Sequence, residues 1–117
     1  MNVRLLMPAR SGRDAPVIAL HSSGASGRQW DPLAVALLGS REVIAPDLHG
    51  HGRGPLPPVD RPSIVAADAA FVAGLLRSVR GGVHLVGHSY GAAIALKVAL
   101  EHPDAVHSVT AIEPLMF

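Results

Sequence analysis

Residues 83–100 read VHLVGHSYGAAIALKVAL, and they carry the strongest structural signal in the sequence. Its first four residues are rich in apolar side chains, which is typical of a short strand, and the alanine-rich run from residue 92 onward is typical of a helix. Between them stands the pattern G-x-S-x-G, with Ser89 at its centre. A serine on a tight turn from strand to helix projects its hydroxyl where it can act as a nucleophile. The stretch therefore predicts a catalytic Ser89 rather than a turn whose small residues serve packing alone.

The residues around Ser89 have expected roles in this turn, which we call the elbow (residues 87–91). Gly87 and Gly91 lack the side chains that would collide where the strand folds back onto the helix. The N-terminus of that helix directs partial positive charge to the place where an oxyanion would form. His88 adjoins the serine, but neighbouring residues of a strand point to opposite faces, so its ring is expected to face away.

The rest of the chain alternates short apolar segments with helical patterns. This alternation predicts an α/β fold in three layers, with a mostly parallel sheet and helices on both faces. Residues 1–117 are expected to form a single, incomplete domain of this kind. The expected strands are 17–20, 42–45, 83–86 and 106–112, with a weaker one at 3–6, and the expected helices are 29–38, 63–79 and 90–101.

The first helix has two possible start signals. Ser26 and Gln29 have the spacing of a capping box, while Asp31-Pro32 would place a proline in the first turn, so an irregular start is expected. Gly39 is expected to end this helix. Residues 50–62, rich in proline and glycine, predict a surface loop.

The composition excludes several classes of protein. The chain has 49% hydrophobic residues and a formal net charge of +1, with arginines spread along it, so no nucleic-acid surface is expected. It has no cysteine, which excludes disulfides, thiolate metal sites and a cysteine nucleophile. No apolar run approaches the ~20 residues of a membrane span, and no signal peptide opens the chain, so a cytoplasmic protein is expected. His49 and His51 have no third ligand nearby at a suitable spacing, so we expect neither a metal nor another cofactor.

Several motifs, in the same order along the chain, resemble those of the α/β-hydrolase superfamily and its serine hydrolases. Beside the elbow, His21-Ser22-Ser23-Gly24 resembles the oxyanion loop of that family, and residues 47–54 resemble its glycine-rich loop after the fourth strand. Residues 101–112 resemble the passage into the sixth strand. The resemblance runs from about residue 16 to the last residue, the N-terminal half of such an enzyme. It implies a hydrolase that acts on an ester, thioester, lactone or related carbonyl substrate.

The resemblance also implies roles for residues near Ser89. The backbone N–H groups of Ser23 and Tyr90 would form the oxyanion hole. His21 would organise the loop rather than act as a base. Ser22 stands where the family has a glycine, so the resemblance does not settle the backbone shape of this loop.

The catalytic triad of the family runs serine, acid, histidine along the chain. The acid usually follows the seventh strand and the histidine the eighth, whereas this chain matches the family only just past the sixth. Some relatives place the acid after the sixth strand, where Glu113 stands, so Glu113 is a possible acid; the alternative is a solvated carboxylate at the end of a strand. Loss of the base costs roughly 10⁶-fold in kcat in a subtilisin-type triad. We therefore expect the histidine to lie beyond these residues, and the 117 residues alone to turn over esters very slowly or not at all.

A second hypothesis is a non-catalytic remnant or interaction module. The strand expected at 106–112 would be the edge of the partial sheet, exposing backbone groups and apolar side chains. This predicts self-association, or pairing with another polypeptide, through that edge. Fluorophosphonate labelling of Ser89 separates the two hypotheses, because a serine that is not activated reacts poorly.

Overall fold

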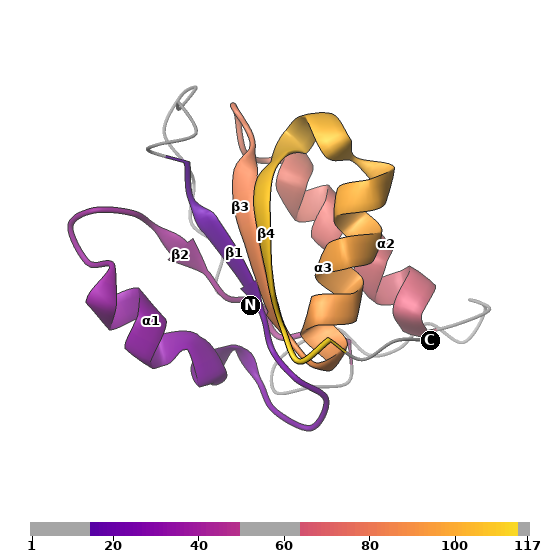
Figure 1. Ribbon diagram of the computed structural model, residues 1–117, viewed down its shortest axis with the longest axis horizontal. Coiled ribbons are helices and arrows are strands. Elements are labelled where there is room, and N and C mark those ends of the chain that lie inside the picture. Colours follow the sequence, from indigo (N-terminus) through magenta and orange to yellow (C-terminus); the bar gives the residue numbers. More distant parts are fainter. Residues whose placement is uncertain (1–14, 50–63, 115–117) are drawn as a thin grey trace.

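The sheet is four-stranded and entirely parallel in the computed structural model, which describes residues 15–49 and 64–114. Its strand order is β2-β1-β3-β4, so the strand that carries the elbow lies inside the sheet (Figure 1). The expected α/β class is therefore confirmed. The weaker strand expected at 3–6 and the loop expected at 50–62 lie outside the described residues. The strands are β1 Val17–Leu20, β2 Val43–Ile44, β3 Val83–His88 and β4 Val106–Ile112.

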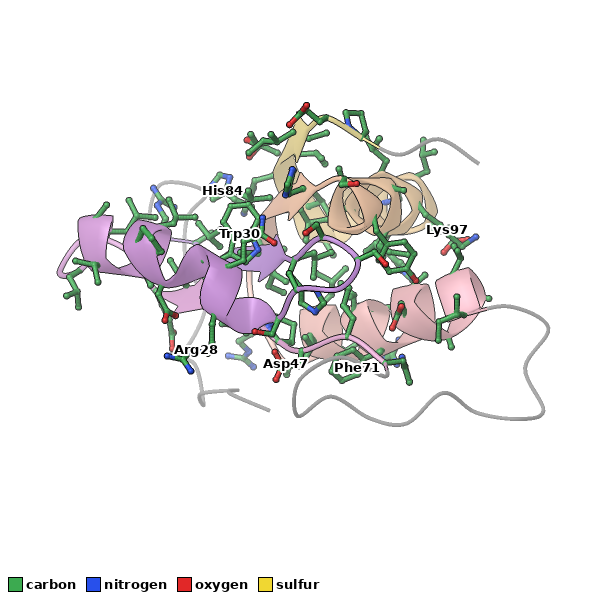
Figure 2. The ribbon with its side chains drawn as sticks, turned by 90° about the horizontal axis from the view of Figure 1, so that it is seen from below. Arg28, Trp30, Asp47, Phe71, His84 and Lys97 are labelled. Atoms are coloured by element: carbon green, nitrogen blue, oxygen red, sulfur yellow. The ribbon has the colours of Figure 1, made fainter. Side chains whose placement is uncertain are left out.

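Helices cover both faces of the sheet, as predicted (Figure 1). On one face, the 3₁₀ helix η1 (Gly27–Trp30) and α1 (Asp31–Ala36) pack on β1, with the Trp30 side chain between helix and sheet (Figure 2). On the other face lie α2 (Ile64–Arg77) and α3 (Tyr90–Glu101), which share the larger core with the sheet. A short 3₁₀ helix, η2 (Pro103–Ala105), connects α3 to β4. No helix within the described ranges is both long and apolar enough to cross a membrane.

The burial of β3 alternates along the strand. Val83 and Leu85 are fully buried in the core that α2 and α3 share with the sheet. His84, Val86 and His88 alternate with them and are half-buried. Apolar cover on both faces was expected for this strand. The cover is complete on one face only: on the other, Val86 packs against the cluster of Val17, Ala19 and Trp30 but stays half-buried.

Ser26 is the N-cap of η1, as one of the two start signals predicted, but the reciprocal Gln29 bond of a capping box is not formed. The Ser26 hydroxyl accepts a hydrogen bond from Arg28 N–H at 3.3 Å, while the Gln29 amide turns away from the helix start to bond other segments. The irregular start is confirmed, because η1 leads directly into α1. The α-helix ends earlier than predicted, at Ala36, and the chain reaches the left-handed region at Gly39, with φ +83°.

Candidate functional site

The backbone at Ser89 adopts a conformation that few residues other than glycine adopt. Its φ is 56° and its ψ is −111°, between the last residue of β3 and the first residue of α3. Such a conformation costs roughly 1–3 kcal/mol and persists only where the surrounding structure holds it. The chain thus turns sharply from strand to helix at Ser89.

Both glycines of the elbow stand where no side chain fits. A Cβ on Gly87 would lie 2.4 Å from the carbonyl oxygen of Gly91. A Cβ on Gly91 would lie 2.2 Å from the carbonyl oxygen of Leu20, at the end of β1. The first turn of α3 therefore packs directly against the backbone at the carboxyl ends of β1 and β3.

Backbone hydrogen bonds hold the strained residue while its side chain stays unbonded. Ser89 N–H donates to the Ile112 carbonyl at 2.9 Å, and the Ser89 carbonyl accepts from Ala92 and Ala93 N–H at 3.1 and 3.2 Å. The side chain is half-buried and does not cap α3, and within the described part of the chain no group bonds its hydroxyl. The hydroxyl therefore lies at the positive end of a twelve-residue helix dipole.

His21 holds the loop that follows β1, which we call the oxyanion loop (residues 21–25). Its ring is fully buried, and Leu48 N–H donates to its Nε2 at 3.0 Å. The proton of the neutral ring is therefore on Nδ1, which donates to the Ser22 carbonyl at 2.7 Å. Ala25 N–H donates to the same carbonyl at 3.1 Å. Because the peptide bond is planar and trans, these two donors orient Ser23 N–H to the opposite side.

The oxyanion loop and the elbow lie next to each other at the carboxyl ends of two neighbouring strands. β1 and β3 are parallel neighbours, with Leu20 paired to Gly87. Ser23 and Tyr90 each lie three positions beyond this pair, so their amides follow the carboxyl ends of adjacent strands. Ligands of open α/β sheets bind outside the carboxyl ends of the strands. The fold thus places Ser23 at the carboxyl end of the sheet, as it does Ser89 and Tyr90. The oxyanion hole itself stays a prediction.

His88 and Glu113 lie beside the elbow at the ends of β3 and β4. His88 Nδ1 lies 2.7 Å from the side-chain nitrogen of Gln29, and its Nε2 lies 3.7 Å from a Glu113 carboxylate oxygen. The His88 ring therefore lies against Gln29 and Glu113 rather than against Ser89. The Glu113 side chain is 85% exposed, and its backbone has φ 46°. Its role as an acid stays a prediction.

A buried carboxylate that we did not single out from the sequence lies behind the elbow. Asp68, on α2, is fully buried and accepts hydrogen bonds from the Tyr90 hydroxyl, from His49 N–H at 2.9 Å and from the His49 ring at 2.6 Å. Burial, together with the hydrogen bond to Asp68, raises the pKa of Tyr90 above the usual range of tyrosine. Asp68 shares a helix face with Val72 and Leu75, four and seven positions later, and this lone acid on an apolar stripe was a signal of its burial.

Another carboxylate fastens η1 to the segment that follows β2. Gly27 N–H donates to Asp47 Oδ1 at 2.7 Å, and Asp47 lies beside the helix start in Figure 2. A Cβ on Gly27 would lie 2.2 Å from the Ala45 carbonyl oxygen, so glycine permits this close approach. The oxyanion loop is thus bounded by an anchored helix.

Two further histidines of the described residues bond partners away from Ser89. His84 bonds the Ser108 hydroxyl at 2.7 Å, and His107 bonds the Gly81 carbonyl at 2.6 Å. Within residues 15–49 and 64–114, no three His, Asp or Glu side chains are grouped so that they could hold a metal ion. His51, considered with His49 as a metal pair, lies outside the described residues.

Known proteins resemble this chain along most of its length. Lipase LipV of Mycobacterium tuberculosis is 37% identical over 101 residues, which cover 86% of this chain and 37% of LipV. A haloalkane dehalogenase of Agrobacterium fabrum is 33% identical over 108 residues, which cover 90% of this chain and 34% of the dehalogenase. The solved thioesterase domain from the curacin biosynthetic pathway matches with a TM-score of 0.77 and 28% identity, over 91% of this chain and 40% of that domain.

The chain therefore spans between 34% and 40% of the length of these three proteins. Their names are those of a lipase, a haloalkane dehalogenase and a thioesterase domain. Residues 17–117 also match the model of the Alpha/beta hydrolase family. With its parallel sheet and its strand–turn–helix elbow, the chain belongs to the α/β-hydrolase family.

Proposed function

We propose that this chain carries the nucleophile of a serine hydrolase that acts on an ester, thioester, lactone or related carbonyl substrate. The observation that carries the proposal is the backbone of Ser89, with φ 56° in a turn where Gly87 and Gly91 have no room for a Cβ. A strained serine between strand and helix is the arrangement in which a hydroxyl acts as a nucleophile. A carboxylate at this position would suit dehalogenation, whereas a serine hydroxyl suits acyl transfer.

The proposed reaction uses the groups at the carboxyl edge of the sheet. Ser89 Oγ attacks the substrate carbonyl carbon and passes its proton to a base. The negative charge that forms on the carbonyl oxygen is stabilised by the N–H groups of Ser23 and Tyr90 and by the N-terminus of α3. The intermediate collapses with loss of the protonated leaving group, and water then releases the acyl group from Ser89.

We propose that the base is not among the described histidines. His21, His49, His84, His88 and His107 are each bonded to another partner. His102, at the C-terminal end of α3, lies at the far end of that helix from Ser89. The described residues then contribute only the oxyanion hole and binding, ~10³- to 10⁴-fold over water. Glu113 would be the acid, if the base lies near the ends of β3 and β4.

Site-mapped labelling with a fluorophosphonate tests the nucleophile. The serine oxygen displaces fluoride, and the phosphonyl oxygen occupies the oxyanion hole, so no substrate needs to be known. Even without a base, we expect Ser89 to react about 100-fold faster than exposed Ser40, because the oxyanion hole alone activates the reaction and loss of one oxyanion donor costs ~10²- to 10³-fold. Peptide mass spectrometry reports every serine of the chain in the same sample, which makes the other serines internal controls.

Two variants sharpen this test. Ser89→Ala should abolish the fast label, and Ser40→Ala should leave it unchanged. Equal labelling of all serines, or a fast label that survives in Ser89→Ala, contradicts the proposal. Hydrolysis of an activated ester tests the second part: turnover at the rate of a complete hydrolase, lost in Ser89→Ala, would contradict the absence of a base.

One observation favours a second candidate function, a module that pairs through the edge of its sheet. In the described part of the chain, β4 pairs only with β3 and lies at the end of the strand order. Five of its seven residues are exposed, including Ile112 at 41%. An edge of this length is a template for a further strand. Absence of selective labelling at Ser89, together with concentration-dependent association, would favour this candidate.

A further inference from the structure

Gln29 joins the oxyanion loop to the strand that carries the nucleophile. Its side-chain oxygen accepts a hydrogen bond from Ser22 N–H at 2.9 Å and from the Ser22 hydroxyl at 3.3 Å. Its side-chain nitrogen lies 2.7 Å from His88 Nδ1. Ser22 stands where the family has a glycine, and this amide bridge holds its backbone.

The bridge has a fixed direction. Because the Gln29 oxygen accepts from Ser22, the Gln29 nitrogen is the donor toward His88. His88 Nδ1 must then accept, so the neutral ring carries its proton on Nε2, which faces Glu113 at 3.7 Å. The chain of groups runs from Glu113 through His88 and Gln29 to the N–H of Ser22.

We propose that His88 and Gln29 are positioning residues, and that neutral His88 holds the oxyanion loop in the shape that presents Ser23 N–H to the substrate. This inference rests on the proposed serine-hydrolase function. Hydrogen bonds hold both backbone polar groups of Ser22, because its N–H donates to Gln29 and its carbonyl accepts from His21. The next peptide N–H belongs to Ser23, so the position of Ser22 sets that of the oxyanion donor.

A second proton on His88 breaks this arrangement. Protonated imidazole donates from both nitrogens, so Nδ1–H would face the donor nitrogen of Gln29. Turning the amide over does not help, because its nitrogen would then face Ser22 N–H, which is also a donor. Among the described residues, Glu113 is the charged group within ion-pair distance of His88, and with its side chain 85% exposed it offsets little of this loss. Protonation of His88 therefore removes the hydrogen bond through which Gln29 holds Ser22.

Nuclear magnetic resonance of the 117-residue chain tests the bridge without any substrate. Imidazole ¹⁵N shifts of His88 should show the Nε2–H form at neutral pH. The protection factor of the Ser22 amide against hydrogen exchange should fall about ten-fold when His88 is protonated, the effect of losing one hydrogen bond. The proposal is overturned if His88 is in the Nδ1–H form, or if the protection of the Ser22 amide does not change when His88 is protonated.

Three variants separate positioning from general support of the fold. His88→Asn keeps an acceptor near the place of Nδ1 and does not titrate, so Ser22 should stay protected at both acid and neutral pH. His88→Leu should lose that protection at both. His84→Asn, on the same strand but bonded to Ser108, should keep the pH dependence of the parent chain. Failure of His88→Asn to remove the pH dependence overturns the proposal even if His88→Leu does not fold.

The same variants link the bridge to the nucleophile. The rate of fluorophosphonate labelling at Ser89, relative to the parent chain, should fall about ten-fold in His88→Leu at neutral pH and should be restored in His88→Asn. Selective labelling of Ser89 at the same rate in the parent chain, His88→Leu and His88→Asn overturns the positioning role. If Ser89 is labelled in no chain, the proposed function fails, and the exchange of the Ser22 amide still decides whether the bridge exists.

Discussion

The α-carbon of Gly91 lies so close to the backbone of Leu20 that a methyl group on Gly91 would approach the Leu20 carbonyl oxygen to 2.2 Å. This contact joins the first turn of α3 to the end of β1, and so joins the elbow to the oxyanion loop. The atom in the way is backbone oxygen within the sheet, so it cannot move aside as a flexible side chain would. The arrangement of the candidate site therefore depends on a missing side chain.

Gly91→Ala should accordingly destabilise the chain by about 1–3 kcal/mol, the usual cost of overpacking, because β1 and α3 must separate. Urea unfolding followed by circular dichroism measures the change. Gly74→Ala is the matched control, since its Cβ would meet only an Arg77 side-chain nitrogen at 3.7 Å and it lies inside α2. That variant should gain about 0.5–1 kcal/mol from helix propensity. A Gly91→Ala variant that is as stable as Gly74→Ala would contradict the close approach.

The strain at Ser89 predicts an order of stability among its variants. Ser89→Gly should be more stable than Ser89→Ala by about 1–2 kcal/mol, because glycine adopts positive φ without the clash that Cβ makes. Thermal and urea unfolding of the two variants measure the difference. Both lack the hydroxyl, so a lost hydrogen bond cannot account for it. Equal stability of the two variants would show that Ser89 is not strained.

Tyr90→Phe should cost about 1–3 kcal/mol, because it removes one of three donors to a fully buried carboxylate, Asp68. His49 would remain as the source of the other two. Urea unfolding at neutral pH measures this cost. A variant as stable as the parent chain would show that the Tyr90–Asp68 hydrogen bond contributes nothing to the fold.

The same pair predicts how stability changes in alkali. The pKa of Tyr90 is higher in the folded chain, where burial and Asp68 disfavour the phenolate, than in the unfolded chain, where it is about 10. Its contribution is thus complete below about pH 10 and declines above it, by up to about 1.4 kcal/mol per pH unit. Tyr90→Phe should lack this decline. Tyr90 is the single tyrosine, so phenolate absorbance reports on it alone, and ionisation near pH 10 in the folded chain would contradict the prediction.

The exposed edge predicts association of the 117-residue chain. Sedimentation velocity should show an average mass that rises with concentration, as strands pair along β4. Thr110→Lys places a charge on this exposed strand and should shift the chain toward monomer. Val35→Lys, on the 67% exposed Val35 of α1, is the control and should leave association unchanged. A monomer at every concentration would contradict the edge prediction, and an effect of Val35→Lys alone would place the contact on α1.

Local patterns predicted the elements of the fold well where neighbouring residues decide the structure. The alternation around residues 83–101 indicated strand, turn and helix, and the structure has them as β3, Ser89 and α3. Helix ends were less accurate. The Ser26–Gln29 spacing matches a capping box, but the Gln29 amide bonds Ser22 and, 59 positions along the chain, His88 instead. A capping rule considers one helix only and cannot include a competing acceptor on another strand.

Local sequence patterns were enough to predict the parallel α/β architecture and the place of Ser89, because hydrophobic period, glycine spacing and strand-to-helix turns act between residues close along the chain. The side chains that hold that serine and its oxyanion loop could not be predicted in this way, because they come from segments far apart in the sequence. Asp68 and Tyr90, which are hydrogen-bonded, lie 22 positions apart in the sequence, and His21 and Leu48 lie 27 positions apart. Such partners come together because the sheet places strand ends side by side. The tautomer of each histidine then follows from the donor that faces it.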